Sequence, residues 1–295
     1  MSKVWLVTGS SRGLGRDLAK AILDAGHKLV ATARKPEDLS DLTAQYGDRV
    51  RAIALDVTDS SAARRAMQVA VSAFGRLDVV VNNAGYANIN AIEDLPEDDF
   101  NAQIATNFFG VVNVSRAALP IMRGQRDGHI IQISSIGGRV GSPGLAAYQS
   151  AKWAVGGFSE VLAKEVGPLG IRVTVVEPGG MRTDWGGSSM RIDAVREEYQ
   201  STVGARSEAM RAQGPSLWRG DPAKVAQMVL RVASEKEPPL RLLAGTDAVF
   251  LADLYAHARA EEDAKWRSLS ASTDFDGMVD FAETPFAKLL RPKGS

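Results

Sequence analysis

A tyrosine and a lysine four residues apart are the first feature of this sequence that points to chemistry. Tyr148 and Lys152 lie in the segment Tyr-Gln-Ser-Ala-Lys, at the start of a predicted helix. A spacing of four places both side chains on one face of a helix, one turn apart. The ammonium would stabilise a phenolate and lower the tyrosine pKa from about 10 toward the working range of an acid/base catalyst. The pair predicts proton transfer, although one such pair also arises readily by chance.

Two further polar positions could complete a site of this kind. Ser134 and Ser135 follow the apolar segment Ile130–Ile133 and precede a glycine pair. Ligands of open α/β sheets bind at the carboxyl ends of strands, where a catalytic hydroxyl belongs, but a serine pair is also ordinary turn chemistry. Asn107 lies in an apolar, helix-like stretch, where a buried amide needs partners. Capping or a helix kink is its structural explanation, and neither excludes a catalytic contribution.

A glycine-rich segment, Thr8–Gly15, directly follows the first apolar run and opens a predicted helix. Glycines let a backbone turn tightly against a pyrophosphate, and a helix N-terminus presents unpaired N–H groups and a positive dipole. Three residues separate Gly9 from Gly13, so the spacing differs from G-x-G-x-x-G. The segment predicts dinucleotide binding, with a simple tight turn as the alternative.

The end of the second predicted strand bears on the type of dinucleotide. A site for NAD usually has an acidic residue there, about 20 residues beyond the glycines, to bind the ribose hydroxyls. In this sequence Ala33 takes that place and Arg34 follows. Arg34 and Arg12 could hold a 2′-phosphate by charge-assisted hydrogen bonds. We therefore predict NADP rather than NAD; the alternative is that both arginines are solvated surface residues.

Short apolar segments alternate with helical patterns over the first 245 residues. Their hydrophobicity is mostly continuous, as in parallel strands that are covered on both faces. The predicted strands are Val4–Val7, Leu29–Ala33, Val50–Leu55, Val79–Val81, Ile130–Ile133, Val173–Val176 and Leu240–Leu243. The predicted helices are Gly13–Ala25, Asp59–Phe74 and three that begin near Pro96, Tyr148 and Asp221-Pro222. This alternation predicts an α/β fold, a Rossmann-type doubly wound parallel sheet of about seven strands flanked by helices, with a C-terminal helical extension.

The chain is expected to form a single domain over 1–295, with a core at 3–245. The stretch 185–220 is long for a connection and contains Trp185, Met190, Tyr199, Met210, Leu217 and Trp218. Such a stretch is typical of a substrate loop or lid over an apolar pocket, and ordinary packing is the alternative. In the extension 246–295, the spacing of Leu251, Leu254, Tyr255 and Ala258 suggests a packed helix.

Composition excludes several classes of function. Thirty-five basic and 35 acidic residues give a net charge of +0, so charge offers no reason to expect a nucleic acid or anionic membrane partner. The absence of cysteine excludes disulfides and thiolate chemistry, and three scattered histidines do not predict a metal site. No apolar run approaches the roughly 20 residues of a membrane span, and no signal peptide is evident, so a cytoplasmic protein is expected.

Taken together, these motifs resemble the short-chain dehydrogenase/reductase family, in its one-domain branch and nearest to its hydroxysteroid-dehydrogenase-like members. The order and spacing of the motifs agree with the family, and Ser135 fits better than Ser134 because the family serine precedes the tyrosine by thirteen residues. The matching motifs are Thr8-Gly9-x3-Gly13-x-Gly15, Asn82-Asn83-Ala84-Gly85, Asn107, Ser135, Tyr148-x3-Lys152 and Pro178-Gly179.

The resemblance implies a role for each catalytic residue. Tyr148 would protonate the carbonyl oxygen as hydride arrives, and Lys152 would lower the tyrosine pKa and hold the ribose hydroxyls. Ser135 would hydrogen-bond the substrate oxygen, and Asn107 would support a proton relay through water. The implied cofactor-binding residues are Gly9, Ser11, Arg12, Gly13, Leu14, Gly15, Arg34, Asp56, Val57, Asn83, Ala84, Gly85, Tyr148, Lys152, Pro178, Gly179 and Thr183.

The resemblance also implies an NADP(H)-dependent oxidoreductase, a ketoreductase-like enzyme that interconverts a carbonyl and an alcohol. The substrate is expected to be a hydrophobic small molecule, and the protein a homodimer or homotetramer. Gly156 and Gly157, within the helix of the Tyr–Lys pair, would be explained by close packing between subunits. Arg139 and Arg182 could meet an anionic substrate, but both are expected to be solvated.

Three rival interpretations fit the sequence less well. A regulator that senses NADP(H) without turnover would keep the glycines and lose the tyrosine or lysine. A methyltransferase of similar fold would not need Ser135, Tyr148 and Lys152 in register. A nucleotide-sugar epimerase or dehydratase shares Tyr-x3-Lys but has a different glycine spacing and a larger substrate domain.

Overall fold

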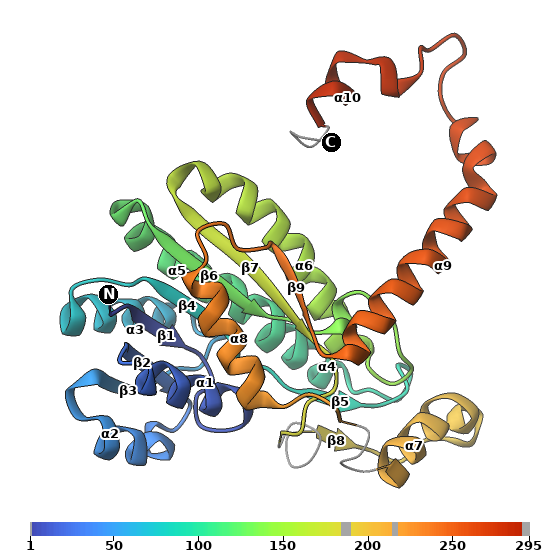
Figure 1. The fold of residues 1–295 in the computed structure, drawn as a ribbon. Helices are drawn as coiled ribbons and strands as arrows, with labels where there is room; N and C mark the ends of the chain where they lie inside the picture. The colour runs from blue at the N-terminus through green and yellow to red at the C-terminus, as the bar shows by residue number, and fades with distance from the viewer. Residues whose placement is uncertain (1, 184–189, 214–217, 291–295) are drawn as a thin grey trace. The chain divides into compact units, whose positions relative to one another are not determined.

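A seven-stranded parallel sheet forms the centre of the protein (Figure 1). The computed structural model describes residues 2–183, 190–213 and 218–290. The strands are β1 (Val4–Val7), β2 (Lys28–Ala33), β3 (Val50–Ala54), β4 (Val79–Asn82), β6 (Gly128–Ile133), β7 (Ile171–Pro178) and β9 (Arg241–Ala244), in the order β3-β2-β1-β4-β6-β7-β9. Each predicted strand is found within about two residues, and the predicted Rossmann-type fold is confirmed.

The strands form where the sequence is apolar without alternation. Every residue of β1, β4 and β6 is buried, because helices cover both faces of the sheet. β2 and β3 extend the sheet from one side of β1, whereas β4, β6, β7 and β9 extend it from the other. After β3 the chain crosses back and forms β4 on the other side of β1, so the topological switch point lies between β1 and β4. Ligands of such sheets bind outside the carboxyl ends of the strands at this switch point.

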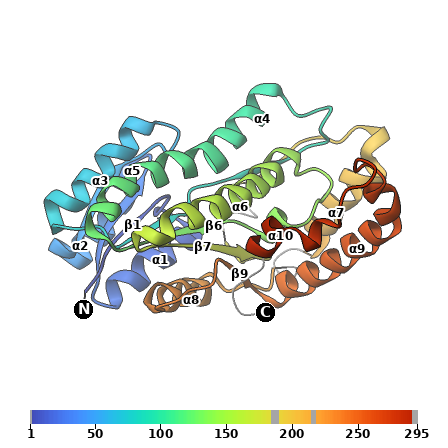
Figure 2. The same cartoon turned by 90° about the horizontal axis from the view of Figure 1, so that it is seen from above.

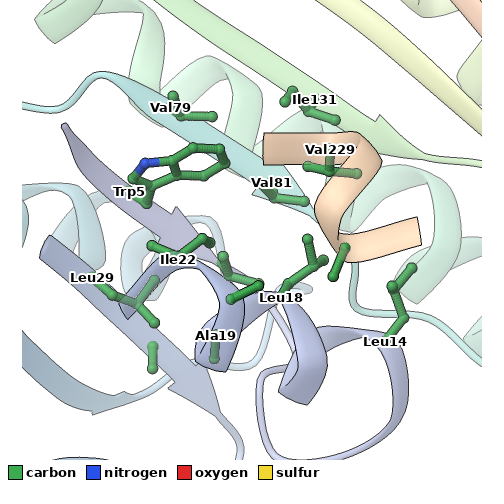
Figure 3. Close-up of a cluster of buried hydrophobic side chains, with 14 of the residues drawn as sticks. Trp5, Leu14, Leu18, Ala19, Ile22, Leu29, Val79, Val81, Ile131 and Val229 are labelled. Carbon is green, nitrogen blue, oxygen red and sulfur yellow. The ribbon is translucent and has the colours of Figure 1, made fainter. Parts of the chain in front are cut away.

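Helices form one layer on each face of the sheet (Figure 2). The helices α1 (Gly13–Asp24), α2 (Ser40–Tyr46) and α8 (Pro222–Ser234) enclose one apolar cluster, in which Leu18 and Ile22 of α1 and Val229 of α8 meet Trp5 (Figure 3). The helices α3 (Ser60–Phe74), α5 (Gly110–Gln125) and α6 (Ala146–Val166) enclose a second cluster on the opposite face. These two clusters are the core that fixes the strand ends.

The helix starts follow the predicted signals. Asp59 caps α3 by accepting hydrogen bonds from the backbone of the first turn, and Asp221 caps α8 in the same way. Pro96 is the N-cap of α4 (Glu97–Ile104), and a π-helical turn, Ala105–Phe109, joins α4 to α5. That turn is centred on Asn107, so the predicted irregularity in the helix is present.

A second, two-stranded sheet was not predicted. β5 (Ala87–Ile89) pairs in parallel with β8 (Met190–Ile192), and α7 (Ala205–Gln213) follows β8. Three-residue strands are too short to leave a periodic signal in the sequence. This small sheet joins residues 190–192 to the residues after β4. Trp185 and Leu217 of that stretch lie outside the described residues.

Contacts between Cα atoms divide the chain into two units, 1–252 and 253–295. The boundary falls within the C-terminal helix α9 (Thr246–Ala271), whose first turns bury Ala248 and Ala252 against Ile136 and Val140. The second unit contains the remainder of α9, the turn Phe281–Glu283 and α10 (Pro285–Leu290). The C-terminal helical region is confirmed, while the single domain and the packing of Leu254, Tyr255 and Ala258 stay predictions.

None of the helices in the described part of the chain is both long and apolar enough to cross a membrane. Within the same part of the chain, no group of three or more histidine or acidic residues is placed to hold a metal ion.

Candidate active site

A cavity of about 430 Å³ lies at the carboxyl edge of the sheet, around the switch point between β1 and β4. Its volume is in the range of small-molecule and cofactor sites. Every residue that the sequence predicts for the site lines this cavity: Gly9, Ser11, Arg12, Gly13, Leu14, Gly15, Arg34, Asp56, Val57, Asn83, Ala84, Gly85, Asn107, Ser135, Tyr148, Lys152, Pro178, Gly179 and Thr183. Folding therefore brings together segments that are up to 174 positions apart, from Gly9 to Thr183.

The glycine segment is a tight turn locked to the end of β4. Gly9 has a φ of +69°, a region that favours glycine, and a Cβ at Gly15 would collide with the Gly9 carbonyl. Thr8 Oγ1 accepts hydrogen bonds from the backbone N–H groups of Asn83 and Ala84, at 2.9 and 3.0 Å. Asn83 Nδ2 donates to the carbonyls of Thr8 and Gly9. Two strand ends are thus held together at the floor of the cavity.

The N-terminus of α1 opens on this cavity without a capping side chain. Its N-cap residue, Arg12, is extended and makes no side-chain capping bond, unlike Asp59 of α3 and Asp221 of α8. The first backbone N–H groups of a helix carry the positive end of its dipole and need acceptors. Gly13, Leu14 and Gly15 line the cavity at this point. The arrangement suits an anionic group such as a pyrophosphate.

Two arginines lie at the same end of the cavity. Arg12 and Arg34 both line it and are both exposed, and neither guanidinium makes a hydrogen bond or ion pair with another described residue. Ala33, at the end of β2, is buried and brings no carboxylate. Asp56 also lines the cavity, but its Oδ1 already accepts hydrogen bonds from the N–H and hydroxyl of Thr58. The charge here is positive, as a phosphate requires.

Helix α6 and the turn after β6 bring the catalytic candidates together at the other end of the cavity. Lys152 Nζ donates a 2.8 Å hydrogen bond to the Ile133 carbonyl and lies 5.5 Å from the centroid of the Tyr148 ring. The Tyr148 hydroxyl is hydrogen-bonded to the side chain of Ser135. Both the tyrosine and the lysine are buried. Ser135, Tyr148 and Lys152 are therefore adjacent, as their spacing in the sequence predicts.

The pKa values in this group differ from the prediction. Burial raises the pKa of Tyr148 to about 12, and the hydrogen bond with Ser135 opposes this rise. Burial also lowers the pKa of Lys152 to about 8. The predicted lowering of the Tyr148 pKa by Lys152 is wrong for the protein's own groups, because the ammonium is itself desolvated and bonds the Ile133 carbonyl. Among these groups, the desolvation of the phenolate outweighs its stabilisation.

Asn107 is fully buried in the π-helical turn. Its Nδ2 donates to the carbonyls of Tyr86 and Gln103, and its Oδ1 accepts from the Tyr86 N–H. A Cβ at Gly85 would lie 2.5 Å from that Oδ1, which explains the glycine. One amide hydrogen and Oδ1 thus fix the loop after β4 at Tyr86, and the other amide hydrogen bonds the last turn of α4. One lone pair of Oδ1 remains for another donor.

The Tyr148 ring lies in an apolar cluster that joins α6 to the small sheet. Its buried members are Ala87, Ile89, Ala91, Leu145, Tyr148 and Val203, and Ile192, Val195, Tyr199 and Met210 pack against them. Hydrogen bonds between the Asn90 amide and Asp193, and between the Tyr199 hydroxyl and Glu93, tie the segment after β8 to this place. The described part of 185–220 therefore packs beside the catalytic candidates, and its action as a lid stays a prediction.

Two predictions about residues near the site are corrected by their contacts. Arg139 is half-buried rather than solvated, and it pairs with the buried Glu177. Gly156 is explained within the chain: a Cβ there would lie 2.6 Å from Nη2 of Arg241. A Cβ at Gly157 meets nothing within 4 Å, so the subunit-packing hypothesis stands for that residue alone. Arg182 is exposed as expected, and its Nε donates to the Trp218 carbonyl.

Seven residues that line the cavity have no predicted role in the site: Ala33, Leu55, Tyr86, Thr106, Ile133, Gly180 and Met181. Ser134, the serine that the family spacing disfavours, lines it too. Ala33, Leu55, Tyr86, Thr106 and Gly180 each adjoin a predicted residue, so extending the motifs by one position would have found them. Ile133 and Met181 are two positions from the nearest predicted residue, and the fold brings them in.

Comparisons with known proteins give a consistent result. The family model described as short chain dehydrogenase matches residues 3–191. "Oxidoreductase BOA17" of Botryotinia fuckeliana is 56% identical over 274 residues, which are 92% of this chain and 100% of that protein. A short-chain dehydrogenase from Streptomyces avermitilis is 38% identical with a TM-score of 0.86, over 92% of this chain and 98% of the other. The structure of ElxO with NADP bound is 28% identical with a TM-score of 0.69, over 83% of this chain and 97% of ElxO.

Proposed function

This chain belongs to the short-chain dehydrogenase family of oxidoreductases, and on that premise we propose that it is an NADP(H)-dependent enzyme that interconverts a ketone or aldehyde and an alcohol, with Tyr148 as acid/base. One observation carries the proposal. The adjacent Ser135, Tyr148 and Lys152 lie in the same cavity as the uncapped N-terminus of α1. A proton-transfer group and an anion site thus share one small-molecule cavity.

The residues of the cavity fit a nicotinamide dinucleotide. The uncapped first turn of α1 would hold the pyrophosphate, and Lys152 would hold the ribose hydroxyls. Asp56 and Val57 would line the adenine, and Pro178, Gly179 and Thr183 would lie at the nicotinamide end. When bound, the cofactor supplies or accepts the hydride.

The chain's own contribution is proton transfer at one oxygen. In the direction of reduction, Tyr148 would give its hydroxyl proton to the carbonyl oxygen as the carbon accepts hydride. Ser135 would donate a hydrogen bond to the same oxygen and stabilise the charge that develops there. A Tyr148 pKa of about 12 keeps the phenol protonated at neutral pH, which is the form that donates a proton in reduction. A water molecule that donates a hydrogen bond to the remaining lone pair of Asn107 Oδ1 would be part of the relay that returns a proton to Tyr148.

The choice of NADP rests on Arg12 and Arg34. Both guanidinium groups line the cavity and have no ion-pair partner among the described residues. A 2′-phosphate would give each of them charge-assisted hydrogen bonds. The likeness to ElxO, whose structure has NADP bound, agrees with this choice. NADP dependence also favours the reductive direction.

The surroundings of Tyr148 bear on the substrate and the assembly. Its apolar neighbours favour a hydrophobic carbonyl compound over a charged one. Phe109, the N-cap residue of α5, and Val161 of α6 are exposed, and Gly157 faces open space. We propose that α5 and α6 form a homodimer or homotetramer interface there. Equilibrium sedimentation at micromolar concentration tests this, and the detection of monomer alone would exclude the interface. A cytoplasmic location stays a prediction.

A turnover screen tests the proposed function. NADPH oxidation is followed over a panel of ketones and aldehydes, and NADP reduction over the matching alcohols. We expect turnover of at least one hydrophobic carbonyl compound, with a preference for NADPH over NADH. Absence of turnover with both cofactors over the whole panel, by a protein that binds NADPH, would favour the non-catalytic regulator.

A further inference from the structure

A carboxylate that solvent does not reach lies directly behind the candidate active site. Glu177, in β7, is 0% exposed and immediately precedes Pro178, which lines the cavity. Arg139 donates from Nε and Nη2 to Glu177 Oε2, the former at 2.8 Å. Arg241 of β9 donates from Nη1 to Oε1 at 2.7 Å. Both oxygens of the buried carboxylate are therefore compensated by cations, as burial of a charge requires.

The same network is attached to the helix that carries the catalytic candidates. Arg241 also donates to Glu160 of α6, at 2.9 Å from Nε. Tyr148, Lys152, Gly156 and Glu160 follow one another at intervals of four, so they form a stripe along α6. The guanidinium of Arg241 fills the space that Gly156 leaves. One end of this stripe is the reaction centre, and the other end is the ionic network.

The turn after β6 connects the ionic network to the reaction centre, because Ser135 and Arg139 lie at its two ends. This turn begins at Ser135, whose Oγ accepts the Gly137 N–H at 3.0 Å, and closes at Arg139, whose N–H bonds the Ile136 carbonyl. A Cβ at Gly138 would lie 2.9 Å from the Lys152 carbonyl, so the turn packs tightly against α6. Arg139 ties the far end of the turn to β7 through two hydrogen bonds that converge on Oε2 of Glu177. These charge-assisted bonds to a carboxylate that is itself fixed in β7 hold the guanidinium, and with it the end of the turn.

We infer that Glu177 is a positioning residue, which acts through Arg139 to hold the Ser135 turn where the hydroxyls of Ser135 and Tyr148 share one substrate oxygen. The inference rests on the proposed function, because only that reaction needs the two hydroxyls together. Glu177 does not line the cavity, so it acts at one remove from the substrate and cofactor. The alternative is that the network serves stability alone.

Three variants separate these alternatives. Arg139→Gln releases the Ser135 turn, whereas Arg241→Gln removes the other cation from the same carboxylate and leaves the turn tied. Glu177→Asp keeps both ion pairs but shortens the side chain by one methylene, so it displaces Arg139 without stranding a buried charge. Crystal structures give the Ser135 Oγ to Tyr148 Oη distance in each folded variant. Steady-state kinetics with NADPH give kcat and the KM values.

We expect Ser135 to move by about 1 Å in Arg139→Gln and Glu177→Asp, and kcat to fall by up to about 10²-fold while the KM for NADPH changes little. Arg241→Gln should keep Ser135 in place and retain most of kcat. If Arg139→Gln does not fold, Glu177→Asp decides. An unmoved Ser135 with parental kcat in Glu177→Asp would overturn the inference. An equal displacement of Ser135 and an equal loss of kcat in Arg241→Gln would also overturn it, because the network would then contribute to stability alone.

The two readouts keep this inference separate from the proposed function. A parent protein that turns over no carbonyl compound would count against the proposed function. The crystallographic distance would still decide whether Glu177 positions Ser135, because that measurement needs no turnover.

Discussion

Lys152 Nζ lies 5.5 Å from the centroid of the Tyr148 ring and gives a hydrogen bond to the Ile133 carbonyl. The lysine is thus held between the helix that carries the tyrosine and the strand that leads to Ser135. Lys152 therefore links α6 to β6 in addition to carrying a titratable group. Tyr148, in turn, has Ser135 as its hydrogen-bonded neighbour and an apolar cluster around its ring.

The burial of Lys152 predicts how stability changes with pH. Its pKa falls from 10.5 in the unfolded chain to about 8 in the folded protein. Between these values the unfolded state binds more protons, so the free energy of unfolding rises with pH. From pH 7 to pH 10 the parent should gain roughly 2 to 3 kcal/mol relative to Lys152→Met. Urea unfolding at the two pH values measures this gain, and parallel curves for the two proteins would contradict it.

Arg34→Asp should change cofactor preference. The variant loses a guanidinium that would bond a 2′-phosphate and gains a carboxylate that would accept from ribose hydroxyls. The ratio of kcat/KM for NADPH to that for NADH should fall by about tenfold or more. Arg123→Asp, the same charge change at an exposed residue of α5 outside the cavity, is the control. An unchanged ratio in Arg34→Asp would remove the proposed phosphate clamp.

Gly15→Ala should abolish tight cofactor binding. A Cβ at this position collides with the Gly9 carbonyl and approaches Asn83 Nδ2, so the turn at the end of β1 must open. We expect the Kd for NADPH, followed by its fluorescence, to rise by about 10²-fold, as for a displaced binding group. Gly124→Ala is the matched control, because its Cβ meets nothing within 4 Å and alanine favours a helix by about 1 kcal/mol. Equal Kd values for the two variants would contradict the role given to this turn.

Much of the fold could be predicted because the seven main strands are continuous apolar segments bounded by turns and capped helices. The short strands β5 and β8 could not, since three residues carry no periodicity. They pair although Ile89 and Met190 are about 100 positions apart, so only the tertiary fold brings them together. The small sheet and its apolar cluster beside Tyr148 therefore depend on tertiary contacts.

The part of the candidate site that lies within short stretches of sequence was predictable, and the part that depends on distant contacts was not. Tyr148, Lys152 and Ser135 have a fixed spacing within one helix and one turn, so sequence distance stands for spatial distance. Arg139 and Glu177 are 38 positions apart, and nothing in the sequence pairs them. The direction of the Tyr148 pKa was missed because it depends on burial, which spacing does not reveal. The sequence suggests that Gly156 packs against a partner subunit, because no pattern pairs it with Arg241, the residue of a distant strand that fills its space.

The central claim is that the Tyr148 hydroxyl carries the proton, and Tyr148→Phe tests it most directly. The variant keeps the ring in its apolar cluster and removes only the hydroxyl, so the fold and the Kd for NADPH should be preserved. With the best carbonyl substrate of the parent, kcat should fall by about 10²- to 10⁴-fold. A folded Tyr148→Phe that binds NADPH and reduces that substrate at the parental rate would contradict the account.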